Sequence, residues 1–137
     1  MGLTVLDAGV LIGLFDRNDA HHPEAVTALR DAVERNDRIS LPASAYAEVL
    51  VGPSRKGADA VATVDQFVEQ LPIDVVPLDR SIAAIAAALR AQHRTLRLPD
   101  ALVIATARSL EADRLVTTDR GWPTGHQLGL RGDLVEL

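Results

Sequence analysis

The spacing of apolar residues predicts that strands and helices alternate along this chain. The stretch from Leu3 to Asp7 is mostly apolar, too short for a helix, and stops on an aspartate, so it predicts a strand. A strand this apolar is expected at the centre of a parallel sheet that helices cover on both faces. Asp7 would then stand at the carboxyl end of the strand, the edge where open α/β sheets bind ligands.

Other short apolar runs predict three more strands and a candidate fifth, at 38–41, 73–78, 114–117 and 134–137. The segments between them repeat apolar residues with the period of a helix, over 8–15, 22–35, 45–50, 58–71, 80–93 and 98–112. Ser44 would cap the third helix, and the Gly- and Pro-containing stretch 51–57 predicts a loop. The alternation predicts a three-layer α/β domain with a four- or five-stranded parallel sheet, spanning residues 1–137 as one domain.

Composition narrows the chemistry. The absence of cysteine excludes disulfides, thiolate metal sites and a cysteine nucleophile. A formal net charge of -5 argues against a general basic nucleic-acid-binding module. No apolar stretch approaches the roughly 20 residues of a membrane span, and the N-terminus lacks the basic region of a signal peptide. We therefore expect a cytoplasmic protein.

Four acidic residues lie at strand ends or in the helices that adjoin them. Asp7 and Asp119 follow the first and fourth strands, Glu48 lies about one turn into the helix after the second strand, and Asp100 opens a largely apolar helix before the fourth. Each alone could be a helix cap, a turn residue or an exposed helix position. Together they are harder to dismiss, because two carboxylates about 4 Å apart repel by roughly 4 kcal/mol at an effective dielectric near 20. Such a cluster requires a cation, and oxygen ligands suit Mg²⁺, or Mn²⁺ as a substitute.

Other candidate ligands are weaker. Asp79 also ends a strand, but if the third strand lies outside the second it is too far from Asp7 to share an ion, and it is interpreted as a helix cap. The histidines have no metal-ligand spacing to one another, which favours structural roles for them.

The residues around these acids resemble a known family. V-L-D-A-G-V-L-I around Asp7, S-A-Y-A-E-V-L around Glu48, L-P-D-A-L-V-I-A-T-A around Asp100 and L-V-T-T-D-R-G-W around Asp119 look like the four signature blocks of the PIN domain. The closest resemblance is to the VapC toxins of bacterial type II toxin-antitoxin modules. It covers essentially the whole chain, in the family's order and spacing.

The resemblance implies a parallel sheet in strand order 3-2-1-4-5, with the acids meeting beside strands one and four. It implies an Mg²⁺-dependent ribonuclease, usually a homodimer, that a cognate antitoxin neutralises. Thr117 matches the threonine of the family's T-x-D pattern. Two positions depart from it: Ala8 stands where Thr or Ser is frequent, and Gly121 stands where many members carry another acid, which bears on a second metal site.

Our hypothesis is therefore a toxin endoribonuclease. Asp7 and Asp100, helped by Glu48 and Asp119, would hold one or two Mg²⁺ ions that activate a water for in-line attack on an RNA phosphodiester.

Two further features concern binding partners. Arg90, Arg94 and Arg97 are expected on one helix face, where they could steer the RNA backbone or simply be solvated. A groove near Gly52 and Pro53 would accept an amphipathic antitoxin helix.

Two alternatives stay open. A phosphoaspartyl phosphatase or receiver domain would use Asp7 as nucleophile or phosphoacceptor, but such proteins need a lysine after a later strand, and Lys56 is the only lysine. A second Asp would also be expected at the position of Gly9 in such a phosphatase. The other alternative is a non-catalytic PIN-like domain that binds RNA or a protein.

Overall fold

A computed structural model describes all 137 residues and contains a five-stranded parallel sheet in the order β3-β2-β1-β4-β5. The strands are β1 (Leu3–Leu6), β2 (Arg38–Pro42), β3 (Ile73–Val76), β4 (Arg114–Thr117) and β5 (Asp133–Glu136). The helices are α1 (Ala8–Phe15), α2 (His22–Glu34), α3 (Ala43–Lys56), α4 (Ala58–Gln70), α5 (Arg80–Gln92) and α6 (Leu98–Ser109). The predicted fold class, strand order and fifth strand are confirmed.

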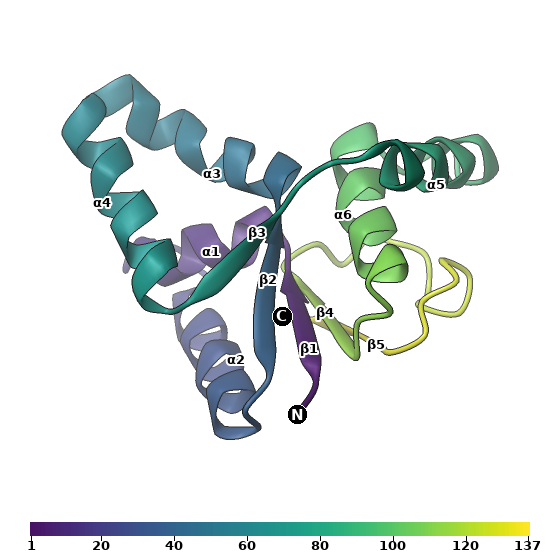
Figure 1. Cartoon of the computed structure of the whole chain (residues 1–137), viewed down its shortest axis with the longest axis horizontal. Helices are drawn as coiled ribbons and strands as arrows, with labels where there is room; N and C mark the ends of the chain where they lie inside the picture. The colour runs from purple at the N-terminus through teal and green to yellow at the C-terminus, as the bar shows by residue number, and fades with distance from the viewer.

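The sheet separates two layers of helices: α1 to α4 lie on one side, and α5 and α6 on the other (Figure 1). Strand β1 is buried along its whole length, and its Val5 lies opposite Ser40 on β2 and Leu115 on β4. Helix α6 is also deeply buried, with Val103 to Ala107 in the core. None of the six helices combines the length and the apolar composition needed to cross a membrane.

At the amino edge of the sheet, the Asp37 side chain bonds to the start of β1, to Arg35 at the end of α2 and to Arg114 on β4. Its side chain is 2% exposed and accepts hydrogen bonds from the Gly2 amide (3.0 Å), the Thr4 hydroxyl (2.9 Å) and Arg35 Nε (3.1 Å). Arg114 Nη1 lies 3.4 Å from the same carboxylate. Burial acts to raise the pKa of Asp37, but these hydrogen bonds and the charge of Arg35 outweigh it and lower the pKa. The contacts stabilise the end of the sheet opposite Asp7.

The predicted loop over 51–57 is wrong, because α3 continues from Ala43 to Lys56 through Pro53. The predicted cap is also wrong: Pro42, not Ser44, precedes the first helical residue. Proline in a helix removes one backbone hydrogen bond, but α3 packs against both α1 and α4, and this packing maintains the helix. Gly57, with φ of +127°, ends α3 in a conformation that only glycine adopts readily.

The predicted arginine face is also wrong. Helix α5 ends at Gln92, so Arg94 lies in the following turn and Arg97 is the residue that precedes α6. Arg90 Nη1 donates to the carbonyls of Arg94 (3.3 Å) and Leu96 (2.9 Å), which stabilises this turn. The three arginines therefore have different environments and cannot form one helical stripe.

Candidate active site at the carboxyl edge of the sheet

Asp7 lies where β1 passes into α1 and is only 8% exposed. Its backbone amide donates to the Val116 carbonyl of β4 (2.9 Å), which keeps the two strand ends together. One carboxylate oxygen, Oδ1, accepts from the Ala8 amide (2.7 Å), so Asp7 caps α1, a role that the sequence did not predict for it. The other oxygen, Oδ2, accepts from the Thr117 hydroxyl (2.7 Å). Capping thus orients the carboxylate, and a second contact fixes it from β4.

Thr117 joins two of the predicted acids. It is fully buried, and its Oγ1 donates to Asp7 while accepting from the Asp119 amide (3.0 Å). Asp119 Oδ1 in turn accepts from the Gly121 amide (2.7 Å), a local turn in which glycine replaces the additional acid of the family pattern. The end of β4 therefore positions Asp119 relative to Asp7 through one hydroxyl group.

Asp100 is the third residue of α6, in the first turn, as predicted. Its side chain is 17% exposed, and its Oδ2 lies 3.8 Å from Arg97 Nε. The indole N–H of Trp122 is buried without a hydrogen-bond partner, yet it is near enough to act on the pKa of Asp100. Trp122 was not assigned a role from the sequence, although it closes the fourth signature block.

Glu48 lies on the exposed side of α3. Burial raises the pKa of its carboxyl group first, followed by the charges of Asp7 and Asp100, while Arg97 lowers it. These interactions place Glu48 in the electrostatic field of the other acids. It is the most accessible member of the group.

Asp7, Asp100 and Asp119 repel one another, and Glu48 is repelled by Asp7 and Asp100. Burial is the largest cause of the raised pKa of Asp7, and the charges of Asp100 and Asp119 add to it against the hydrogen bonds from Thr117 and Ala8. Burial likewise raises the pKa of Asp100, with a further contribution from Asp119. The fold therefore brings together all four predicted acids and leaves their charges incompletely balanced.

The donor set suits a hard divalent cation, because every candidate ligand in the cluster is a carboxylate. As the side chains lie in the structure, no three acidic or histidine residues are arranged so that they could hold a metal ion together. Water and substrate oxygens would therefore complete the coordination, as is usual for Mg²⁺.

Gly9 is a second residue whose role the sequence did not reveal. A Cβ at this position would overlap the hydroxyl oxygen of Thr118, directly after Thr117. The start of α1 therefore packs closely on the segment that carries Thr117 and Asp119, and any larger residue would require the Thr118 side chain to move.

The remaining candidates lie apart from these acids. Asp79 Oδ1 accepts from the Ile82 amide (2.8 Å) and caps α5, as predicted. His22 Nδ1 contacts the Gly13 carbonyl (2.7 Å), and His21 Nδ1 lies 3.6 Å from Asp19. Lys56 ends α3 and lines a groove with Gly52 and Pro53.

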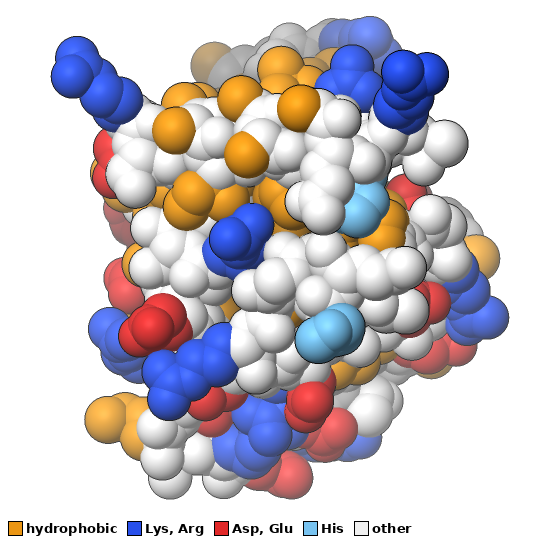
Figure 2. Space-filling model, turned by 90° about the vertical axis from the view of Figure 1, so that its right-hand side faces the viewer, with side chains coloured by type: hydrophobic (Ala, Val, Ile, Leu, Met, Phe, Trp, Pro, Cys, Tyr) orange, Lys and Arg blue, Asp and Glu red, His pale blue; other side chains and the backbone are white.

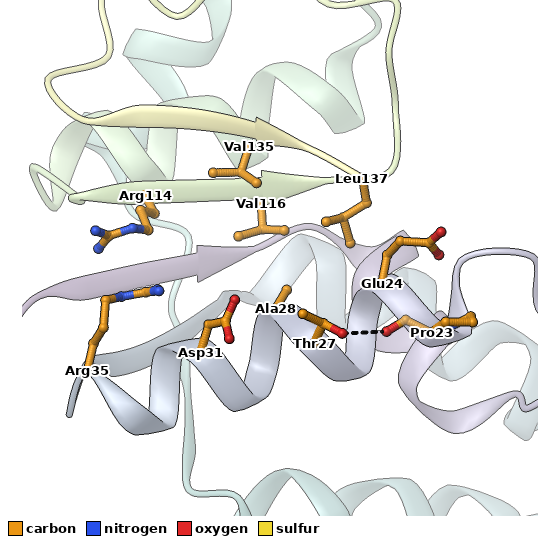
Figure 3. A pocket seen from close by; sticks show the side chains of 10 residues that line it. All are labelled: Pro23, Glu24, Thr27, Ala28, Asp31, Arg35, Arg114, Val116, Val135 and Leu137. Carbon is orange, nitrogen blue, oxygen red and sulfur yellow. Dashed lines mark hydrogen bonds between the residues drawn. The ribbon is translucent and has the colours of Figure 1, made fainter.

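A cavity of about 400 Å³ lies between α2 and strands β4 and β5 (Figure 3). Its walls combine apolar side chains, including Val116 and Val135, with Asp31, Arg35 and Arg114. None of the four predicted acids lines it, so this cavity is separate from the candidate site.

The sequence model of the PIN domain matches residues 4–124, a range that contains all four acids. The chain belongs to the PIN domain family. No curated protein matches its sequence.

Solved structures share the architecture of this PIN domain. VapBC2 from Rickettsia felis, bound to a promoter DNA fragment, has a TM-score of 0.75 and 15% identity over 98% of both chains. A toxin-antitoxin complex from Klebsiella pneumoniae has a TM-score of 0.64 and 25% identity over 88% of this chain and 92% of its own. VapC20 of Mycobacterium tuberculosis, a toxin that cleaves the sarcin-ricin loop, has a TM-score of 0.65 and 14% identity over 82% of this chain and 86% of its own.

Proposed function

We propose that this PIN domain is a divalent-metal-dependent endoribonuclease and the toxin of a type II toxin-antitoxin module. The observation that carries the proposal is the group of four carboxylates at the carboxyl edge of the sheet, each repelled by at least two of the others, with Asp7 oriented from two sides. A buried carboxylate held this firmly while its charge remains unbalanced is suited to binding a cation.

Asp7 and Asp100 would hold the Mg²⁺ ion, with Glu48 and Asp119 contributing directly or through water. When bound, the ion would supply Lewis-acid chemistry, lowering the pKa of water and offsetting the negative charge that develops on the phosphate. Thr117 keeps Asp7 oriented by donating to Oδ2 and keeps Asp119 adjacent by accepting from its amide. No residue of the chain needs to form a covalent intermediate.

Similarity to the toxin-antitoxin structures supports an RNA substrate and a protein antitoxin. The groove predicted at Gly52 and Pro53 has a volume of about 620 Å³ and is also lined by Ile12, Phe15 and Lys56. Ile12 is 38% exposed, which leaves apolar surface for an amphipathic antitoxin helix. This groove lies beside α1 and α3, the two helices that follow Asp7 and carry Glu48.

We further propose that the chain forms a homodimer. Five exposed alanines lie on α5: Ala83, Ala84, Ala87, Ala88 and Ala91. In Figure 2 hydrophobic side chains gather across the upper part of the face that carries α5, with basic side chains at its ends. Small side chains allow a second helix to approach closely. Sedimentation at micromolar concentration tests this, and a monomer would contradict it.

The test of the nuclease is RNA cleavage by purified protein before and after exhaustive EDTA treatment, followed by Mg²⁺ or Mn²⁺ addition. Activity should disappear and then return. Undiminished cleavage in EDTA would refute the metal mechanism. Metal binding without cleavage, together with RNA binding, would instead support the non-catalytic alternative.

A further inference from the structure

Arg97 is the one basic residue that acts on the cluster of four acids. It lies directly before α6, and its Nε is 3.8 Å from Asp100 Oδ2. Burial and the neighbouring acids raise the pKa of both Asp100 and Glu48, and the positive charge of Arg97 partly offsets this rise. These two acids come from different helices, α6 and α3, and the guanidinium group lies beside the one that α6 contributes.

The contact with Asp100 contributes little to folding. The Arg97 side chain is 79% exposed, its distance to the carboxylate exceeds that of a hydrogen bond, and it makes no cap contact with α6. Exposed ion pairs of this kind contribute little to stability. Arg90, by contrast, donates to two backbone carbonyls of the adjoining turn. Arg97 is therefore free to exchange its partner.

The charge balance indicates what that partner is. Four carboxylates carry four negative charges, and one divalent ion leaves a negative excess that would repel an RNA phosphate. A guanidinium group at the same site offsets part of that excess, and its planar donors match the oxygens of a phosphate. The ion pair with Asp100 keeps this cation beside the proposed metal site while RNA is absent.

We propose that Arg97 binds a backbone phosphate of the RNA substrate beside the metal site, exchanging its ion pair with Asp100 for that phosphate. The inference rests on the proposed ribonuclease function. It assigns to one side chain two effects of opposite sign, because a cation next to the acids weakens metal binding but strengthens RNA binding.

Arg97→Gln tests both effects. Mn²⁺ affinity, measured by calorimetry without RNA, should rise about threefold or more because a competing positive charge is removed. Affinity for a labelled single-stranded RNA oligonucleotide should fall roughly tenfold or more, because a charge-assisted contact to phosphate is lost. Arg97→Lys keeps the charge but not the planar donors, so it should preserve the Mn²⁺ affinity and restore RNA binding only in part.

Arg94→Gln is the matched control. Arg94 is exposed in the preceding turn and makes no ion pair with the four acids, while its structural contact uses the backbone carbonyl. Neither affinity should change by more than about twofold in Arg94→Gln.

Unchanged affinities in Arg97→Gln, alongside a wild type that binds Mn²⁺ and cleaves RNA, would overturn the inference alone. Loss of both affinities with a lower Tm would overturn it in favour of a structural role. A wild type that binds no Mn²⁺ would overturn the proposed function and this inference together.

Discussion

Replacing Asp7 by asparagine should stabilise the metal-free protein while abolishing metal binding. The asparagine Oδ1 can accept from the Ala8 amide, and its Nδ2 can donate to Thr117 Oγ1, which has a second lone pair for the Asp119 amide. Asparagine is also as good a helix cap as aspartate. The substitution therefore keeps both side-chain contacts of Asp7 and removes its charge, but it reverses the hydrogen bond with Thr117, whose buried hydroxyl hydrogen loses Asp7 as its acceptor.

The size of the effect follows from the repulsion within the cluster. Two like unit charges about 8 Å apart repel by roughly 2 kcal/mol at an effective dielectric near 20, and by less where solvent screens them, which sets the order of magnitude for each acid that repels Asp7. Removing the charge of Asp7 should therefore raise the free energy of unfolding by roughly 1–3 kcal/mol and raise Tm by at least about 3 °C. Asp79→Asn is the matched control, since Asp79 also caps a helix; its Tm should stay within about 2 °C of wild type.

The pH dependence has a definite sign. The pKa of Asp7 is raised in the folded state, so between its unfolded and folded pKa values the native protein binds more protons, and the free energy of unfolding decreases as pH rises. The difference in free energy of unfolding between Asp7→Asn and the wild type should therefore be small in acid and reach its full size above the raised pKa of Asp7.

Thermal melts across this pH range, with and without Mn²⁺, provide the assay. Saturating Mn²⁺ at about 100 times its Kd should stabilise the wild type by about 2.7 kcal/mol and leave Asp7→Asn unchanged. A metal-free Asp7→Asn that melts several degrees below wild type, while Asp79→Asn does not, would show that the charge of Asp7 is structural. Retention of the Mn²⁺-induced rise would refute its role as a ligand.

Three further predictions follow from other contacts. Asp37→Asn should lower the free energy of unfolding by roughly 2–4 kcal/mol near neutral pH. Because the pKa of Asp37 is lowered in the folded state, this loss should shrink as pH falls through that pKa. Denaturant titrations near neutral pH and near pH 3 will measure both values. Gly9→Ala should cost roughly 1–3 kcal/mol of stability and weaken Mn²⁺ binding, and adding Thr118→Ala should restore much of both in melts and calorimetry. Asp100→Asn should abolish Mn²⁺ binding whereas Glu48→Gln should reduce turnover more than affinity, and equal losses of affinity would contradict this ranking.

The amino-acid sequence by itself determined the order and type of the elements, because apolar periodicity reports which face of each segment is buried. It also placed each acid at a strand end or in an adjoining helix, since Asp7, Asp100 and Asp119 directly border apolar runs. The cap at Asp79 could be predicted from the same local pattern. These features depend on residues only a few positions apart.

Tertiary structure decided the rest. Packing of α3 against α1 and α4 keeps it helical past Pro53, where local propensity predicted a loop. The hydrogen bond from Thr117 to Asp7 joins residues 110 positions apart. No local pattern encodes such a contact, because it forms only when β1 and β4 lie side by side in the sheet.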